Sequence, residues 1–125
     1  MSKEQGPSRA IRSYRDLEVW QEGIALVREV YRLTTSWPSG ERFGLTSQIR
    51  RASVSVPSNI AEGWGRHKRG EFDQFLRYAR GSLFEVETQL IIAEEVGLTD
   101  PDDLTPVLQR IDRLSRRITA LRRTL

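Results

Sequence analysis

Two long segments of the sequence, residues 71–96 and 102–125, repeat their apolar residues every seven positions. The two rows of the first segment are Phe72, Ala79, Val86 and Ala93, and Leu76, Leu83 and Leu90. The two rows of the second are Leu104, Ile111, Ile118 and Leu125, and Val107, Leu114 and Leu121. Paired rows with this spacing form the seam along which helices pack, at crossing angles of about 20°. The pattern therefore predicts two long helices of a bundle, over residues 71–96 and 102–123.

The segment from Asp16 to Ser36 predicts a further helix. Its apolar residues follow alternating spacings of three and four, which is the stripe of an amphipathic helix. They are Leu17, Trp20, Ile24, Val27 and Tyr31. Asp16 is a suitable N-cap, because a short carboxylate can accept bonds from the first backbone N–H groups. Pro38 ends the helix, because it disfavours helical geometry at the residue before it.

The segment from Glu41 to Arg66 also has helical periodicity, yet it has a proline in its middle. Pro57 donates no hydrogen bond to the carbonyl of Ser53 and crowds it, at a cost of about 3 kcal/mol in an ordinary helix. Short polar side chains surround the proline and can bond the backbone groups that a kink frees. They are Ser53, Ser55, Ser58 and Asn59. The segment predicts a helix kinked at Pro57, whose kink either serves core packing or shapes a binding or assembly surface.

Four amphipathic helices with short connectors and no strand-like alternation predict an all-α fold. We expect a single-domain, up-down antiparallel four-helix bundle over residues 14–125. Residues 1–13 are polar, basic and aperiodic, and we expect a disordered arm there. No apolar run approaches the roughly 20 residues that a membrane helix needs, and there is no cysteine. These features indicate a protein of the cytoplasm that does not interact with membranes.

The sequence contains no recognisable catalytic or metal-binding pattern. Its one histidine, His67, lies in a charged connector, and no Glu-x-x-His or glycine-rich phosphate loop is present. The most prominent carboxylates, Glu62, Glu85 and Glu87, lack a matching nucleophile and are better explained as partners in salt bridges. We therefore expect no catalytic residues, no metal, no cofactor and no enzyme activity.

The basic residues are the strongest positive signal. The net charge is only +3, but arginines outnumber lysines by 18 to 2 and gather in two groups. The first group is Arg50, Arg51, Arg66, Lys68 and Arg69, and the second includes Arg110, Arg113 and Arg117. Arginine's planar fork suits phosphates and carboxylates equally. These residues therefore bind a polyanion or pair with acidic faces within or between subunits. Trp64, beside the first group, either stacks on a nucleic-acid base or packs in the core or at an interface.

Four ordered motifs resemble one known family. They are residues 14–20 (YRDLEVW), 43–52 (FGLTSQIRRA), 56–63 (VPSNIAEG) and 79–90 (ARGSLFEVETQL). Together they resemble the bacterial four-helix-bundle proteins encoded in 23S rRNA intervening sequences, to which the accessory variability protein of diversity-generating retroelements is similar. The resemblance implies assembly into a homopentameric ring and binding of RNA or DNA through basic surfaces. It also implies a protein partner such as a reverse transcriptase, and no known catalysis.

The resemblance further implies packing or ring-forming roles for residues in these motifs. They are Trp20, Pro57, Asn59, Glu62, Gly63, Gly81, Glu85 and Glu87. In this hypothesis the three glutamates pair with arginines within or between subunits, and the remaining arginines line a ring surface that meets phosphate. We thus expect a non-catalytic, oligomeric nucleic-acid-binding accessory protein. The alternatives are a protein-interaction scaffold with no nucleic-acid ligand, or an uncharacterised enzyme.

Overall fold

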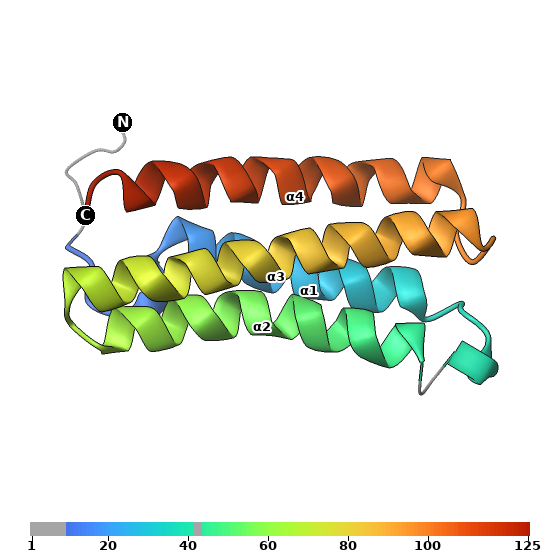
Figure 1. Cartoon of the computed structure of the whole chain (residues 1–125), viewed down its shortest axis with the longest axis horizontal. Helices are drawn as coiled ribbons and strands as arrows, with labels where there is room; N and C mark the ends of the chain where they lie inside the picture. The colour runs from blue at the N-terminus through green and yellow to red at the C-terminus, as the bar shows by residue number, and fades with distance from the viewer. Residues whose placement is uncertain (1–9, 42–43) are drawn as a thin grey trace.

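A computed structural model describes residues 10–41 and 44–125, and these residues form four α-helices and no strand. The helices are α1 (Glu18–Thr34), α2 (Leu45–Gly65), α3 (Arg69–Glu95) and α4 (Pro101–Arg122). Two short 3-10 turns, η1 (Tyr14–Asp16) and η2 (Ser39–Glu41), precede α1 and α2. The four helices run alternately up and down, and α4 returns to pack against α1 (Figure 1). This confirms the all-α single-domain prediction. Residues 1–9 of the predicted arm, and Phe43, lie outside the described residues.

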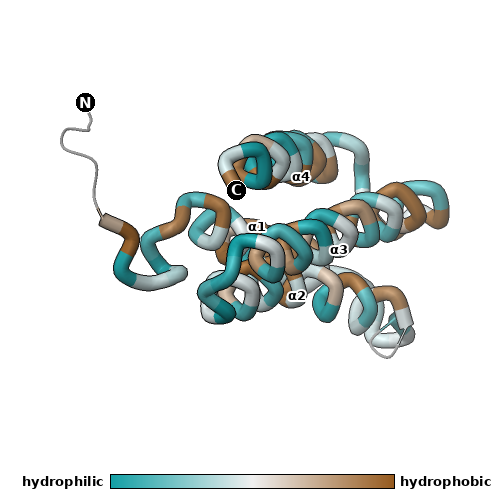
Figure 2. The backbone as a smooth tube through the Cα atoms, turned by 60° about the vertical axis from the view of Figure 1, so that its left-hand side comes forward, coloured by the Kyte–Doolittle hydropathy of each residue, from teal (hydrophilic) through white to brown (hydrophobic). Residues whose placement is uncertain are grey.

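The heptad rows of α3 and α4 contribute to the core as predicted, except that Phe72 and Leu121 are half-buried and Leu125 is 37% exposed. The buried apolar residues of α3 are Leu76, Ala79, Leu83, Val86, Leu90 and Ala93, and those of α4 are Leu104, Val107, Ile111, Leu114 and Ile118. The colours of the backbone tube show apolar and polar residues alternating along the helices (Figure 2). None of the helices in the described ranges is long and apolar enough to cross a bilayer.

The start of α1 differs from the prediction. Asp16 is not the N-cap of α1 but the last residue of η1, where its carboxylate accepts from the backbone N–H groups of Arg12 (2.9 Å) and Ser13 (3.1 Å). The Ser13 hydroxyl in turn accepts from the N–H of Arg15 (3.2 Å). This reciprocal arrangement is a capping box. The capping box starts a short helical turn at Ser13, three residues before the predicted N-cap Asp16. The helix α1 begins only after Leu17.

The buried stripe of α1 also differs from the predicted one. The residues that face the core are Val19, Gly23, Leu26, Val30 and Thr34. The predicted stripe lies on the adjacent face: Trp20, Ile24 and Val27 are half-buried, and Tyr31 is 42% exposed. Because α1 is apolar on two adjacent faces, periodicity alone cannot tell which face packs inward.

Pro57 lies buried inside α2, which is assigned as one helix from Leu45 to Gly65. A glycine of α1 makes room for the ring, since a Cβ atom on Gly23 would lie 3.3 Å from the Cβ of Pro57. The flanking polar side chains bond the backbone of α2, as expected. Ser53 donates to the carbonyl of Arg50 (2.8 Å) and Asn59 to that of Ser55 (2.8 Å). The kink itself stays a prediction.

Small residues set the spacing of α2 and α3. A Cβ atom on Gly63 would lie only 2.5 Å from the Cβ of Phe75, so this glycine permits a close helix approach. The hydroxyls of Ser55 and Ser82 share a hydrogen bond across the same pair of helices (2.7 Å). Gly81 has no such role within the chain, because it is exposed and a Cβ atom there would meet nothing within 4 Å.

Candidate nucleic-acid interface

The directions of the four helices separate the charges toward the two ends of the bundle. The α2–α3 connection and the end of α4 lie at the same end, which we call the basic end (Figure 1). Its basic residues are Arg66, Lys68, Arg69, Arg122 and Arg123. The α3–α4 connection lies at the opposite, acidic end, with Glu94, Glu95, Asp100, Asp102 and Asp103. The small net charge therefore conceals a charge separation along the bundle.

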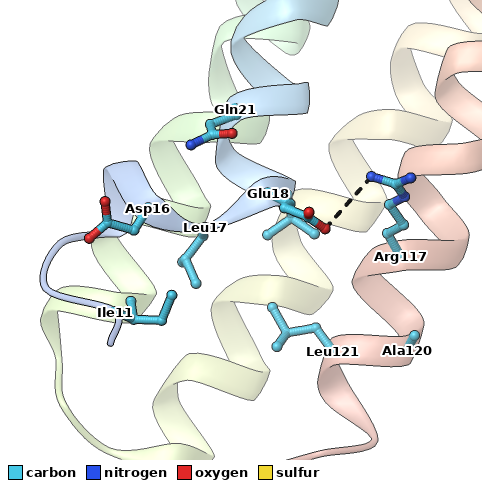
Figure 3. Close-up of a pocket in the computed structure, with 9 residues that line it drawn as sticks. Ile11, Asp16, Leu17, Glu18, Gln21, Arg117, Ala120 and Leu121 are labelled. Atoms are coloured by element: carbon cyan, nitrogen blue, oxygen red, sulfur yellow. Dashed lines mark ion pairs between the residues drawn. The ribbon is translucent and has the colours of Figure 1, made fainter. Parts of the chain in front are cut away.

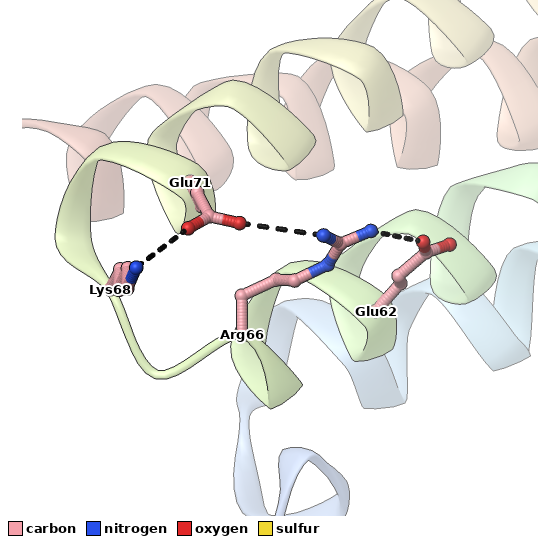
Figure 4. A network of polar contacts seen from close by, with 4 residues as sticks. All are labelled: Glu62, Arg66, Lys68 and Glu71. Carbon is pink, nitrogen blue, oxygen red and sulfur yellow. Dashed lines mark hydrogen bonds and ion pairs between the residues drawn. The ribbon is translucent and has the colours of Figure 1, made fainter.

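The α2–α3 connection holds its cations in a network on the surface (Figure 4). Arg66 bridges Glu62 (3.0 Å) and Glu71 (3.4 Å), and Lys68 lies 3.8 Å from Glu71. The hydrogen bond with Glu62 raises the pKa of Arg66 above its usual value. Exposed ion pairs of this kind stabilise a fold little, so their cations can exchange a carboxylate for a phosphate. Arg69 is exposed and pairs with no carboxylate among the described residues.

The connection is a tight turn between two helices. His67 adopts a left-handed backbone conformation, with a φ of 58°. Non-glycine residues seldom adopt this conformation. The His67 ring meets the half-buried Trp64 edge-on at 5.3 Å, and the guanidinium of Arg66 lies 5.0 Å from the ring of Phe75. Trp64 therefore packs against the turn. This packing fixes the position of the surrounding cations.

Three arginines of α4 pair with acidic residues of other helices. Arg113 and Arg117 both approach Glu22 of α1, whose side chain is only 16% exposed, and the Arg113 distance is 3.8 Å. Arg117 also lies 3.9 Å from Glu18, beside a pocket of about 710 Å³ lined in part by Leu17 and Leu121 (Figure 3). These contacts join α4 to α1.

The third of these arginines joins α4 to α3. The Nε of Arg122 donates to the carboxylate of Asp73 (2.8 Å), and this bond lowers the pKa of Asp73 below its usual value. Asp73 is about one turn after Arg69, so the last turn of α4 lies close to the α2–α3 connection. The end of α4, with Arg122 and Arg123, and the cations of the α2–α3 connection therefore belong to one region of the surface.

The remaining α4 arginines are less constrained. Arg116 is exposed and, among the described residues, pairs only with Asp112 of its own helix (3.2 Å). Arg123 is exposed and Arg110 half-buried, and neither pairs with a carboxylate in the described part of the chain. A shallow hollow of about 540 Å³ lies along this face, lined by Gln109, Asp112, Arg113, Arg116, Arg117 and Ala120.

Arg50 and Arg51 do not join the rest of their predicted group. They precede Arg66 by about four turns of the continuous helix α2. At the rise of an α-helix, this separation is roughly 22 Å along the axis. Arg50 is used internally: its Nε donates to Thr34 (2.9 Å) and its guanidinium lies 4.4 Å from the centre of the Tyr31 ring. Arg51 is exposed and bonds only Ser47 (3.1 Å). The first basic group of the sequence is thus two separate sites.

Comparison with known proteins identifies the family of this chain. Residues 15–120 match the family model described as 23S rRNA-intervening sequence protein. The chain belongs to this family. A solved structure described as a protein with unknown function from the S23 ribosomal protein family of Bacteroides thetaiotaomicron is 16% identical. It aligns over 83% of this chain and 97% of its own with a TM-score of 0.74, which shows a shared fold. Comparison with curated proteins yields no match.

The family match spans the described helices up to residue 120, so Arg122 and Arg123 of the basic end lie beyond it. Among the residues with predicted structural roles, Trp20 packs against the core and meets the ring of Tyr14 edge-on at 5.3 Å. Glu62 pairs with Arg66, as described. Glu85 and Glu87 pair with no arginine among the described residues, and Glu85 contacts Gln89 (3.4 Å).

Sequence reasoning missed Glu22 and Asp73, the two acids that hold the α4 arginines. They lie 95 and 49 residues from their partners and resemble ordinary surface carboxylates of their helices. No local signal distinguishes them. A search for three or more His, Cys, Asp or Glu side chains able to hold a metal ion finds none in the part of the chain described.

Proposed function

We propose that this family member is a non-catalytic, oligomeric accessory protein of the cytoplasm that binds nucleic acid. RNA is the ligand to test first, and DNA is the alternative. The observation that carries the proposal is the gathering of exposed cations at one end of the bundle. These cations are Arg69 of the α2–α3 connection and Arg123 at the end of α4, and Arg116 lies about two turns before Arg123 on the same helix. The planar guanidinium group bonds phosphate oxygens in pairs, which makes such a surface suited to a phosphate backbone.

The exposed face of α4 favours a polyanion over a protein as its ligand. Protein interfaces depend on buried aromatic or aliphatic anchors. This face has none, since its exposed residues from Gln109 to Arg123 are Gln109, Asp112, Arg113, Arg116, Arg117, Ala120 and Arg123. Contacts to phosphate position a protein on nucleic acid without reading sequence. Phosphate contacts alone do not distinguish RNA from DNA, so the experiment below compares RNA with duplex DNA.

Assembly would multiply the effect of each basic end. The resemblance implies a pentameric ring, in which the basic ends of the copies combine into one larger positive surface and raise the binding strength through multivalency. Arg50 and Arg51 would then lie at or near subunit contacts. The competing scaffold function, with a protein partner in place of RNA, is favoured by one observation: α3 exposes several large apolar residues.

A salt titration of labelled structured RNA and duplex DNA tests the proposal. Wild-type protein should bind with an affinity that falls steeply with salt, because phosphate contacts release counterions. The double charge reversal Arg116→Glu and Arg123→Glu should weaken binding and reduce the salt slope by about two per chain.

The control is the single reversal Arg32→Glu, compared with the single reversal Arg123→Glu so that both change the net charge equally. Arg32 is exposed, lies near Asp103 of the acidic end, and among the described residues pairs only with Glu29 (2.8 Å). Arg32→Glu should change the slope far less than Arg123→Glu. An assembled wild-type protein that binds neither ligand at low salt would overturn the nucleic-acid proposal in favour of the scaffold. Equal losses in both variants would show that the basic end is not the site.

A further inference from the structure

An exposed aromatic side chain lies beside the cations of the basic end. Tyr78 of α3 is 49% exposed, and its ring meets that of Phe75 edge-to-face at 5.4 Å. Phe75 is half-buried against α2, where Gly63 leaves room for it. An edge-to-face contact engages at most one face of the Tyr78 ring. Tyr78 is therefore held by a packed ring and keeps an aromatic face open to solvent.

Contacts link Tyr78 to a cation in two directions. Through Phe75, it is linked to Arg66, whose guanidinium lies 5.0 Å from the centre of the Phe75 ring. In the other direction, the side-chain amide of Gln74 donates to the Tyr78 hydroxyl (2.6 Å), and the Gln74 carbonyl oxygen accepts from Arg77. Both arginines are exposed. The open ring therefore lies between an arginine of the α2–α3 connection and an arginine of α3.

The charge around the ring stays positive when the carboxylates are included. The ion pairs of this region join four cations to three carboxylates, part of which Figure 4 shows. Arg69 and Arg123 adjoin them and pair with no carboxylate in the described part of the chain. A surface with this excess attracts a phosphate backbone. The paired cations are Arg66, Lys68, Arg77 and Arg122, and the carboxylates are Glu62, Glu71 and Asp73.

We propose that Tyr78 is a stacking platform for an unpaired base, so that this end of the bundle binds single-stranded nucleic acid. This rests on the proposed function and names the class of nucleic acid. Bases inside a duplex are covered on both faces by their neighbours, whereas an unpaired base can splay out and lie on an aromatic ring. The cations around Tyr78 then contact the phosphates that flank the stacked base.

The other exposed aromatic rings lack this combination. Tyr31 is 42% exposed, but it lies roughly 20 Å along α1 from the basic end, with the guanidinium of Arg50 already 4.4 Å from its centre. Phe84 lies roughly 9 Å beyond Tyr78 along α3 and about a third of a turn away around the helix. Its ring already has Arg80 at 5.1 Å. Tyr78 is therefore the ring that the basic end can use.

Binding of matched strands by Tyr78 variants tests the proposal. The probes are a labelled RNA strand designed to stay unfolded, the same strand paired with its complement, and a strand of the same length in which every nucleotide is abasic. Tyr78→Ala removes the ring, and Tyr78→Phe keeps the ring without its hydroxyl. Because Tyr78 is exposed, both variants should keep the helical circular dichroism of the wild type and its mass in solution. The control is Tyr31→Ala, which removes an exposed ring far from the basic end.

The expected loss is confined to unpaired bases. Tyr78→Ala should bind the unfolded strand about 5- to 150-fold more weakly, the range for stacking of one base, and should bind the duplex and the abasic strand like the wild type. Its salt slope should not change, because the slope counts phosphate contacts and no cation is removed. Tyr78→Phe and Tyr31→Ala should bind the unfolded strand like the wild type. An unpaired DNA strand of the same sequence should show the same loss in Tyr78→Ala, since stacking does not involve the sugar.

Several results would overturn the stacking role. They are an unchanged affinity of Tyr78→Ala for the unfolded strand, an equal loss on all three probes, or a loss in Tyr78→Phe as large as in Tyr78→Ala. A changed mass of Tyr78→Ala alone would also overturn it, because the ring would then belong to a contact between copies. A wild type that binds the duplex but not the unfolded strand would overturn stacking and leave the proposed function intact. A wild type that binds no probe at low salt would refute both.

Discussion

The close approach of α2 and α3 at Gly63 makes the substitution Gly63→Ala a sharp test of the packing. The added Cβ atom would lie 2.5 Å from the Cβ of Phe75, 3.2 Å from its Cγ and 3.3 Å from Cδ1 of Phe72. Carbon atoms in contact normally lie about 3.5–4.0 Å apart, so the nearest pair is too close by about 1 Å. A side-chain rotation cannot move the Cβ of Phe75. The two helix backbones must separate instead.

The expected magnitude is a balance of two terms. Overpacking a well-packed site costs about 1–3 kcal/mol, and the clash with an atom fixed to the backbone favours the upper part of this range. Alanine in place of glycine within a helix recovers about 1 kcal/mol. We therefore expect Gly63→Ala to lower the free energy of unfolding by about 1–2 kcal/mol.

Denaturant unfolding followed by circular dichroism measures this difference, at one protein concentration because assembly contributes to stability. The matched control is Gly65→Ala, two residues along α2, where an added Cβ atom would meet nothing within 4 Å. The control should be as stable as the wild type or more stable. A Gly63→Ala protein at least as stable as the wild type would refute the inference that this glycine sets the α2–α3 distance.

Three further substitutions test the polar contacts and the turn. Asp73→Asn should destabilise the protein at neutral pH. Arg122 lowers the pKa of Asp73 in the folded state, so the stabilisation by this pair is present above the usual pKa near 3.8 and is lost as the pH falls below it. The difference in melting temperature from the wild type should therefore shrink toward pH 2. Glu22→Gln should lower stability by about 1 kcal/mol, since Glu22 joins α4 to α1, and should tighten RNA binding in a filter assay because two arginines are released. His67→Val should lower the melting temperature, because a β-branched residue fits the left-handed backbone of this position poorly, whereas His67→Gly should not. The cost of such a residue in this conformation is about 1–2 kcal/mol.

Much of the fold could be predicted because the helices have an apolar face that repeats with the helix turn. The rows through Leu76 and Leu104 are predicted as buried, and they are buried as far as Leu90 and Ile118, whereas Leu125 at the end of the second row is exposed. The flanking serines of Pro57 are predicted to bond the backbone of α2, and Ser53 does so. These are local properties, set by residues within a turn or two of one another, and a sequence displays them directly.

Less of the candidate site than of the fold could be predicted from the sequence. The role of the arginines in binding nucleic acid stays a prediction. Arg50 and Arg66 do not cluster in space, because both lie along one continuous helix. Each residue between them adds about 1.5 Å of separation along the helix axis. Conversely, Arg122 and Arg69 are far apart in sequence and lie close to one another only because α4 runs back beside α3.

By itself, the sequence determined the number of helices, their inward faces in α3 and α4, and the excess of arginine. Tertiary structure alone decided which apolar face of α1 is buried, because both faces have helical spacing and only packing against Pro57 selects the one with Gly23. It also decided which arginines are held by carboxylates such as Glu22, and it left large apolar side chains of α3 such as Phe84 and Ile92 exposed. Periodicity records how one helix is built, whereas burial and ion pairing depend on what the neighbouring helices bring to its surface.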